Sequence, residues 1–381
     1  MHLESPTSND AGPNDPGPSH EDVQLVQLLT PDGQRIEHPD AAWSGSTDDL
    51  LALHRDMVLT RRVDTEAFAL QRHGELGLWP PCKGQEAAQV GTARALRPQD
   101  MAFASYRGHG VAWVRGVPPE NLLGMYRGTT LGGWDPAEFN LALPAIIIGA
   151  QTLHATGYAM GLTLDGAVGT GDADRDAAVM VYLGDGATSQ GDVLEAMSWA
   201  ASFSLPVVFV VENNHYAISV PVTRQTAVPL VRRADGFGFP GVRVDGNDVL
   251  ACHAVATAAL ERARGGHGPT LIEAVTYRMG AHTTSDDPTR YRDGTESADW
   301  AARDPIDRVR AHLQQLGDPA FAALEEEAEQ LGVHLRAACS AMPEPDLADQ
   351  FDRVFVDPDP DLQRQRDDYV AWRSLETGGV T

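Results

Sequence analysis

Three polar segments of this sequence carry side chains that bind metal ions or anions, and each follows a short apolar run. Asp185 offers a carboxylate, Asn214 an amide oxygen and His282 an imidazole. Magnesium prefers oxygen ligands, keeps water and commonly completes its shell with phosphate oxygens. One carboxylate and one amide are too few for a cage built from protein alone, so we expect a metal ion that bridges to a diphosphate. The segments are Gly184-Asp185-Gly186-Ala187, Asn213-Asn214-His215-Tyr216 and Arg278 to Asp287.

The apolar runs before these segments predict buried parallel strands. They are rich in β-branched residues and alternate along the chain with helical stretches, which indicates an α/β fold: a parallel sheet covered by helices on both faces. Ligands bind outside the carboxyl ends of such strands, so the three segments are expected to meet at one site. A helix that starts after Gly186 adds backbone N–H groups and a positive dipole end. The expected strands are 178–183, 207–211, 242–245 and 270–276, and the expected helices between them are 192–203 and 248–263.

The rest of the chain divides by composition. Residues 1–22 are rich in Pro, Ser, Asn, Asp and Gly and predict a disordered arm, and 23–46 predict an extended lead-in with a turn at Pro31-Asp32-Gly33. We expect one domain over 47–345 and a Pro- and Asp-rich tail over 346–381. A helix is predicted over Thr47–His73, with Thr47 and Asp48 as N-cap candidates and Gly74 at its end. Further expected helices are 85–96, 306–316 and 319–339.

The charge balance limits the classes of partner. The chain has 29 Lys and Arg against 54 Asp and Glu, a formal charge of −25. Such a field repels phosphate, so we expect neither nucleic acid nor an anionic membrane surface as a partner. Binding an anionic cofactor then requires local groups: a metal ion, a few Arg or His side chains and helix N-termini.

The cysteines and the N-terminus favour a cytoplasmic protein. Cys82, Cys252 and Cys339 are far apart, odd in number and form no metal or redox motif, which suits a reducing compartment. Residues 1–10 show no basic region followed by an apolar run, and no apolar stretch reaches the length of a membrane span.

The glycines near Asp185 do not form a nucleotide-binding motif. Gly184, Gly186 and Gly191 read G-x-G-x-x-x-x-G, which differs from the dinucleotide fingerprint, and no phosphate-binding loop ending in Gly-Lys-Ser/Thr occurs. An isolated Gly-Asp-Gly is most often a simple turn. A Gly-Asp-Gly at a strand end, followed about 30 residues later by a second strand that ends in Asn-Asn, is far more specific.

The stretch from Gly184 to Ser219 resembles the thiamine-diphosphate signature of the α subunits of 2-oxo acid dehydrogenases. The resemblance implies that Asp185, Asn214 and the backbone carbonyl of Tyr216 hold magnesium on the diphosphate of thiamine diphosphate. Gly184, Gly186 and Ala187 are the neighbouring cofactor-binding positions. The similarity extends over roughly Leu50 to Leu313, with five motifs in the family's order.

The other motifs of the resemblance place further cofactor contacts. Lys83 to Ala87 is similar to the family's Gly-Gln-Glu-Ala segment. Within Ser105–Gly116, Tyr106 and Arg107 are implied to contact the diphosphate. Ile148-Gly149-Ala150-Gln151 resembles the Gly-Ala-Gln element, which implies that the backbone at Ile146 and Ile148 cups the aminopyrimidine. Thr276–Arg292 resembles the active-site loop, with His282 as its histidine on the cofactor side.

The histidines and the arginine of these motifs also admit structural roles. A lone His is more often a structural hydrogen bonder, and His109 is as open to that role as to one in the site. Near a diphosphate, the charged form of His282 would be favoured. His282 is then expected to order the loop, to help bind the anion and to donate a proton. An Arg such as Arg107 is commonly a surface ion pair, but the acidic background gives one placed by this motif more weight.

At several positions this sequence departs from the family, and these departures limit which of the family's features we expect here. Gly132-Gly133-Trp134-Asp135-Pro136 replaces an element that carries a His in many relatives. Ala145 and Ala150 stand where branched-chain members have hydroxyl residues, so no monovalent-cation site is expected. Ala281 replaces a first loop His. Thiamine catalysis also needs a glutamate against the aminopyrimidine. None is assigned in this chain, and the resemblance implies that the β subunit supplies it.

The sequence therefore predicts one half of an active site. The leading function is the α subunit of a 2-oxo acid dehydrogenase, in a heterotetramer of two α and two β subunits. It would decarboxylate a small 2-oxo acid and pass the acyl group to the lipoyl group of an acyltransferase. Val244–Val249 and Thr283–Asp287 favour branched-chain acids, whereas Ile146–Gln151 and Tyr106–Gly110 favour pyruvate, and branched-chain acids are preferred. A non-catalytic assembly or regulatory homologue and a nucleotide-dependent oxidoreductase are the alternatives.

Overall fold

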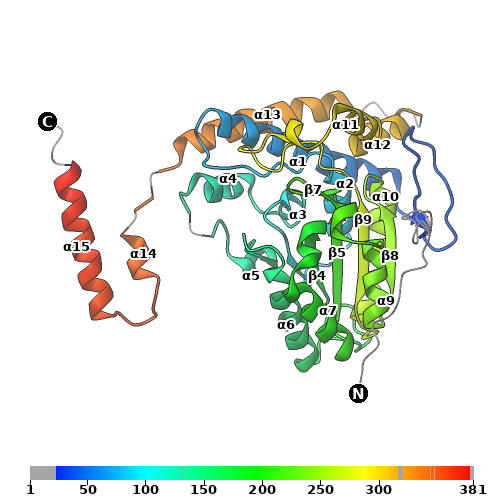
Figure 1. Cartoon of the computed structure of the whole chain (residues 1–381), viewed down its shortest axis with the longest axis horizontal. Coiled ribbons are helices and arrows are strands. Elements are labelled where there is room, and N and C mark those ends of the chain that lie inside the picture. The colour runs from blue at the N-terminus through cyan, green and yellow to red at the C-terminus, as the bar shows by residue number, and fades with distance from the viewer. Residues whose placement is uncertain (1–22, 131, 316–320, 344, 347, 378–381) are drawn as a thin grey trace, which may run out of the picture.

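The computed structural model describes residues 23–130, 132–315, 321–343, 345–346 and 348–377. It contains a seven-stranded sheet with the order β1-β8-β9-β5-β4-β2-β3, and every neighbouring pair in it is parallel. Helices cover both faces (Figure 1), so the predicted fold class is confirmed. The predicted arm at 1–22 lies outside the described residues. The strands are β1 (Leu25–Val26), β2 (Met101–Phe103), β3 (Leu141–Ala142), β4 (Val179–Gly184), β5 (Val207–Asn213), β8 (Gly241–Asp245) and β9 (Thr270–Val275).

The central strands are buried on both faces because their side chains alternate between two cores. Along β4, Met180 and Tyr182 pack in one hydrophobic cluster, while Val181 and Leu183 pack in the other. Successive side chains of a strand point to opposite faces, so a strand between two helical layers is apolar throughout. This is why the continuous apolar runs in the sequence located β4 and β5; β9 is also buried but contains the polar residues Thr270 and Glu273.

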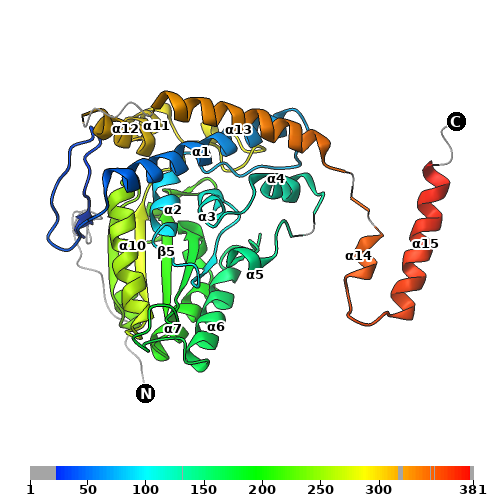
Figure 2. The same ribbon diagram turned by 180° about the vertical axis from the view of Figure 1, so that it is seen from behind.

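Each face of the sheet has its own helices. Those of the first cluster are α2 and α10, which are seen in front in the rear view (Figure 2), and those of the second are α6 and α7 (Figure 1). The predicted helices over 85–96, 192–203 and 248–263 are present, with boundaries shifted by one to three residues. Their bounds are α2 (Glu86–Ala93), α6 (Ala150–Leu164), α7 (Gly191–Ser202) and α10 (Val249–Arg264); shorter helices are α3 (His109–Val114), α4 (Pro119–Arg127), α5 (Pro136–Phe139), α8 (Val222–Gln225) and α9 (Arg233–Phe237).

The first long helix, α1 (Thr47–Arg72), has its N-cap one residue earlier than the sequence suggested. The N-cap is Ser46, not Thr47 or Asp48. The Ser46 side chain accepts from the backbone of Asp49, and the Asp49 side chain accepts from the backbone of Ser46, which forms a capping box. The helix ends before Gly74, which has a φ of +83° as expected for a terminating glycine.

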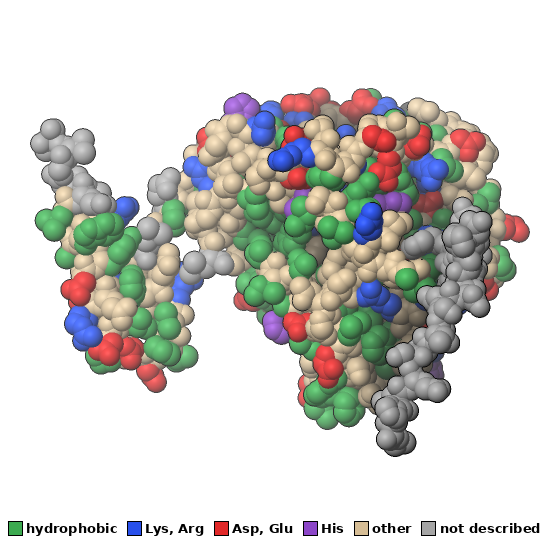
Figure 3. Space-filling view, viewed as in Figure 1, with side chains coloured by type: hydrophobic (Ala, Val, Ile, Leu, Met, Phe, Trp, Pro, Cys, Tyr) green, Lys and Arg blue, Asp and Glu red, His purple; other side chains and the backbone are tan. Residues whose placement is uncertain are grey.

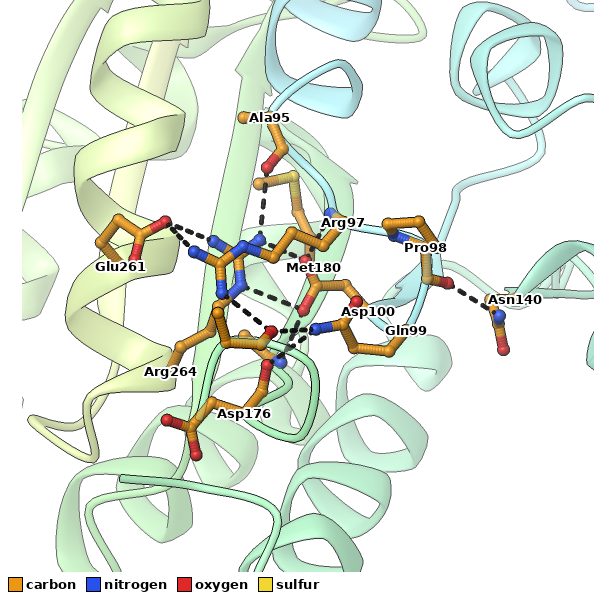
Figure 4. Close-up of polar contacts among 12 residues, drawn as sticks. Ala95, Arg97, Pro98, Gln99, Asp100, Asn140, Asp176, Met180, Glu261 and Arg264 are labelled. Carbon is orange, nitrogen blue, oxygen red and sulfur yellow. Dashed lines mark hydrogen bonds and ion pairs between the residues drawn. The ribbon is translucent and has the colours of Figure 1, made fainter. Parts of the chain in front are cut away.

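A buried ion pair ties the sheet together at the amino ends of its strands, far from the predicted site. Arg264, at the end of α10, pairs with Asp100, and both side chains are buried (Figure 4). Asp100 also accepts from the backbone N–H groups of Ala178 at 2.8 Å and Arg97 at 2.7 Å. These contacts fix α10 relative to the starts of β2 and β4, so the opposite ends of the strands can carry the site without serving the core.

Both edges of the sheet are short. The lead-in contributes β1, which pairs with β8, and the other edge is β3, which pairs with β2. Each edge strand has only two residues. None of the described helices is long and apolar enough to span a membrane.

The C-terminal region is helical, as predicted, and its last part stands apart from the body (Figures 1 and 3). α13 packs along α1, whereas α14 and α15 contact each other. The sequence described 346–381 only as a tail, but α15 is a helix of 18 residues. The predicted helix ends at 316 and 319–320 lie outside the described residues. The helices are α11 (Gly294–Ala301), α12 (Pro305–Gln315), α13 (Phe321–Ala341), α14 (Asp349–Asp352) and α15 (Pro360–Thr377).

Gly84 allows the segment before α2 to contact the strand end that leads into the predicted active-site loop. Its φ is +96°, and a Cβ there would lie 2.2 Å from the Tyr277 carbonyl oxygen. We expect Gly84→Ala to lower the free energy of unfolding by ~1–2 kcal/mol for the left-handed backbone and by a further ~1–3 kcal/mol for the overpacking. Gly74→Ala is the matched control, since it has a φ of +83° and no atom within 4 Å. Denaturant unfolding of both variants checks this; equal losses would contradict the close approach.

Candidate functional site

The three strand-terminal segments meet in one cavity of about 450 Å³ at the carboxyl ends of β4, β5 and β9. Every residue that the sequence proposed for the cofactor lines this cavity. The proposed roles of these residues stay predictions, but their proximity is a property of the fold. The candidates are Tyr106, Arg107, Ile146, Ile148, Gly184, Asp185, Gly186, Ala187, Asn214, Tyr216 and His282.

One wall of the cavity carries the oxygen atoms proposed for the metal. The Asp185 side chain is 1% exposed and follows β4 directly. Burial raises the pKa of its carboxyl, and a hydrogen bond from Gln225 opposes that rise. The Asn214 amide nitrogen donates to Gln85 Oε1 at 3.1 Å, and its Oδ1 accepts from the Tyr216 backbone N–H at 3.4 Å. The third candidate, the Tyr216 carbonyl, accepts from Arg278 at 3.2 Å.

In the described part of the chain, no cluster of carboxylates or histidines supplements these three oxygen ligands. Within the described ranges, no three His, Cys, Asp or Glu side chains are grouped so that they could hold a metal ion. The donors at hand are one carboxylate, one amide and one carbonyl. Such a set suits magnesium only where other oxygens, such as those of water and phosphate, complete the shell.

Two buried guanidinium groups face the same cavity. Arg107 is 5% exposed and Arg278 is 1% exposed. Among the described residues, neither arginine has a carboxylate within ion-pair distance. Both arginines donate their hydrogen bonds to neutral acceptors. Carboxylates act on these arginines only from beyond ion-pair distance, as Asp64 and Glu212 do on Arg107 and as Asp286 does on Arg278. Because a buried charge without a close counter-charge is costly, the two arginines suit an anionic ligand such as a diphosphate.

His282 lies between these two arginines. Its Nδ1 is 3.2 Å from the Arg107 guanidinium and 3.1 Å from that of Arg278. Burial, and then the two positive neighbours, lower the pKa of His282 to about 3. Without an anion the ring is thus neutral, with Nδ1 as acceptor and the proton on Nε2. The charged form expected near a diphosphate requires that anion to offset the arginines.

Polar contacts anchor the loop that carries His282. The Thr284 backbone N–H donates to the Trp79 carbonyl at 2.9 Å, and the Trp79 N–H donates to the Thr284 hydroxyl at 3.1 Å. Arg278 is linked to Asp286 through a tyrosine: it donates to the Tyr291 hydroxyl at 3.0 Å, which donates to Asp286 at 2.6 Å.

The sequence left open whether His109 has a structural role or a role in the site. In the structure, His109 packs inside the protein. It is buried and stacks on Trp79 with ring centroids 4.2 Å apart, and its Nε2 is 2.9 Å from the Pro80 carbonyl oxygen. Burial lowers the pKa of His109 to about 3, so the ring is neutral and donates to Pro80. It does not line the cavity. These contacts with Trp79 and Pro80 favour the structural role for His109.

The structure adds cavity residues that the sequence did not assign to the site. Gln85 and Gln151 lie within recognised motifs, so the motifs themselves contained the signal, whereas nothing in the sequence marked Tyr126. Glu212, the penultimate residue of β5, also lines the cavity and accepts from Gln89 at 2.8 Å. Burial raises the pKa of Glu212 to about 7. It is thus a carboxyl in the site without an assigned role.

Several polar atoms around the cavity are buried and have no partner. The Nε2 atom of Gln85 lacks an acceptor, and the Oε1 atom of Gln151 lacks a donor; both residues line the cavity. Buried polar groups are nearly always hydrogen-bonded in folded proteins. Together with the unpaired arginines, these atoms fit a bound cofactor with anionic and hydrogen-bonding groups.

Comparisons with known proteins agree with this chemistry. The family model described as "Dehydrogenase E1 component" matches residues 54–343. The chain is 48% identical over 359 residues to 3-methyl-2-oxobutanoate dehydrogenase subunit alpha of Mycobacterium tuberculosis, covering 92% of this chain and 94% of the relative. It is 39% identical over 296 residues to pyruvate dehydrogenase E1 component subunit alpha of Staphylococcus epidermidis and of Staphylococcus aureus, covering 77% of this chain and 78% of each relative.

Proposed function

We infer the function from the family of this chain. The chain belongs to the dehydrogenase E1 component family and is an α subunit of a 2-oxo acid dehydrogenase. Membership implies thiamine diphosphate as the cofactor. We propose that magnesium accompanies it and that the substrate is a branched-chain 2-oxo acid. The two unpaired buried arginines beside an oxygen-lined wall carry the proposal, because they need an anion and the wall suits a metal ion bound to that anion.

In this proposal, each group of cavity residues has one role. Asp185, Asn214 and the Tyr216 carbonyl hold magnesium, and Tyr106 and Arg107 bind the diphosphate. Ile146 and Ile148 hold the aminopyrimidine by their backbone, and their side chains shield it from water. His282 moves a proton at its ring nitrogen and orders its loop. Thiamine diphosphate, when bound, supplies the electron sink for decarboxylation, while the protein supplies position and electrostatics.

The proposal includes three partners. A β subunit completes the active site in a heterotetramer of two α and two β subunits, a lipoyl-bearing acyltransferase accepts the acyl group, and a small 2-oxo acid is the substrate. The relatives are named as α subunits, which supports a partner subunit. The free, buried cysteines support a reducing cytoplasm as the location.

The substrate is tested by steady-state rates of the assembled enzyme. With 3-methyl-2-oxobutanoate against pyruvate, we expect kcat/KM to favour the branched-chain acid by about 10- to 200-fold, the discrimination that an apolar pocket gives per methylene. The 48% identical relative supports this order. A preference for pyruvate would instead assign the alternative, a pyruvate dehydrogenase α subunit, to which the chain is 39% identical.

Mixing the chain with its β subunit tests both the split site and the third possibility, a non-catalytic homologue. The pure chain should show no decarboxylation, and adding the β subunit should restore it. Activity of the chain alone would contradict the split site and would make Glu212 the candidate for the missing carboxyl. No activity and no bound cofactor in the complex would favour the non-catalytic homologue.

A further inference from the structure

A glutamine outside the cavity lining holds the proposed metal carboxylate. Gln225, the last residue of α8, donates from Nε2 to Asp185 Oδ2 at 2.6 Å and to the Val220 carbonyl oxygen at 3.0 Å. Both N–H groups of the amide are therefore used. Because both acceptors are oxygens, the orientation of this amide is fixed by its partners.

The contact with Asp185 is selective. Among the residues that the structure describes, Gln225 is the single side chain that hydrogen-bonds the Asp185 carboxylate. It engages Oδ2, while backbone N–H groups of Asp185 and Asn214 also interact with the carboxylate. A carboxylate held by hydrogen bonds is presented to a ligand in one orientation, as are metal-binding carboxylates that are themselves hydrogen-bonded.

The other end of the same amide has no hydrogen-bond partner among the residues that the structure describes. Gln225 Oε1 is buried and unbonded, and it lies 3.9 Å from the position a Cβ would take on Gly186, next to Asp185. Leaving such an acceptor unsatisfied costs about 1–3 kcal/mol. Magnesium keeps several water molecules when it is bound by few protein groups, and such water is a hydrogen-bond donor.

We propose that Gln225 is a positioning residue for the metal: it orients Asp185 through Nε2 and accepts from a water of the metal's shell through Oε1. The inference rests on the proposed function, because it assumes that magnesium binds at Asp185. A purely structural reading is that Gln225 only holds the turn at Val220, and the two readings differ in what they predict for metal affinity.

Calorimetric titration of magnesium into the assembled α and β subunits, with thiamine diphosphate present, separates these readings. Gln225→Met keeps the length of the side chain and removes both hydrogen-bonding functions. We expect it to weaken magnesium binding by about 10- to 100-fold, the usual cost of losing a group that supports a ligand. Gln225→Asn, whose amide is one methylene shorter, should lose affinity in the same direction and is less disruptive should the first variant fail to assemble.

Thr226→Val is the matched control. It removes the hydroxyl contact to the Val228 carbonyl oxygen at 2.8 Å, next to Gln225, without touching Asp185. Magnesium affinity should stay that of the unaltered enzyme. Affinity within about twofold of the unaltered enzyme in both Gln225 variants, or an equal loss in Thr226→Val, would overturn the inference. If the unaltered complex binds no magnesium, the proposed function fails instead, which is a distinct outcome.

Discussion

Replacing Asp185 by alanine should abolish magnesium-dependent binding of thiamine diphosphate and leave the chain folded. The carboxylate lies at a strand end, has one side-chain partner and is buried. Because burial raises the pKa of its carboxyl, the ionised form weakens the folded state at neutral pH. The variant should thus unfold at the same temperature or slightly above it, while its affinity for the cofactor falls by more than about 100-fold.

Asp248 offers the contrasting control, since it is also buried near a strand end but serves the fold. Its carboxylate accepts from four backbone N–H groups, those of Leu28, Leu29, Leu250 and Ala251. Asp248→Ala should lower the unfolding temperature markedly because these donors lose their partner. Calorimetry and thermal unfolding of both variants give the comparison. Unaltered cofactor affinity in Asp185→Ala would remove Asp185 from the metal site.

Replacing His282 by alanine should reduce reductive acylation by about 10²- to 10⁴-fold, the contribution of a positioned acid or base. Folding should stay intact, because the loop is held by main-chain and polar contacts that the substitution keeps. The His282 N–H donates to Asp286 at 2.7 Å, and its carbonyl accepts from Arg107 at 2.9 Å. Rates with a lipoyl acceptor, compared with rates of decarboxylation alone, measure the effect.

Hydrogen exchange tests the physical step behind this prediction. Arg107 and Arg278 both donate to the neutral His282 ring, which brings two positive charges close together beside the loop. The diphosphate offsets these charges, and exchange over residues 277–291 should slow when thiamine diphosphate and magnesium bind. Thr284→Val, which removes the hydroxyl contact to Trp79, should raise exchange in both states. Equal exchange with and without cofactor would return His282 to a structural role.

The sequence predicted the central strands and the site for one physical reason. β4 and most of β5 are continuous apolar runs because they are buried on both faces, and a polar segment begins where each run ends. Asp185 and Asn214 therefore marked both the strand ends and the proposed ligand site. β9 is also buried but contains Thr270 and Glu273. The resemblance to a known family then proposed further positions, such as Arg107 and Ile146.

Other elements left no comparable pattern. β2 has three residues, too few to show a periodicity. α6 begins after Gly149, which has a φ of +89° and provides no side-chain cap, and the helix contains two further glycines, so its start is not marked. The sequence offered Thr47 and Asp48 as N-cap candidates for α1, whereas the reciprocal bonds with Asp49 make Ser46 the N-cap.

Long-range contacts of the site were also invisible in the sequence. Gln225 reaches Asp185 across 40 positions of the chain, as an isolated amide on a four-residue helix. That no carboxylate of the described residues lies within ion-pair distance of Arg107 or Arg278 depends on what surrounds them in space. Such facts follow from packing, which residue types and spacing do not specify.

The two-residue edge strands bear on how the free subunit behaves in solution. An open sheet offers unpaired N–H and C=O groups along its outer strands, and a long, flat edge invites strand addition and fibril growth. Here β1 and β3 present only two residues each. Most exposed large apolar side chains lie instead on helices and loops, among them Trp199 in α7 and Ile146 and Ile147 before α6. Self-association of the unpartnered chain should therefore proceed through helix and loop surfaces and yield amorphous or soluble oligomers that do not bind amyloid dyes.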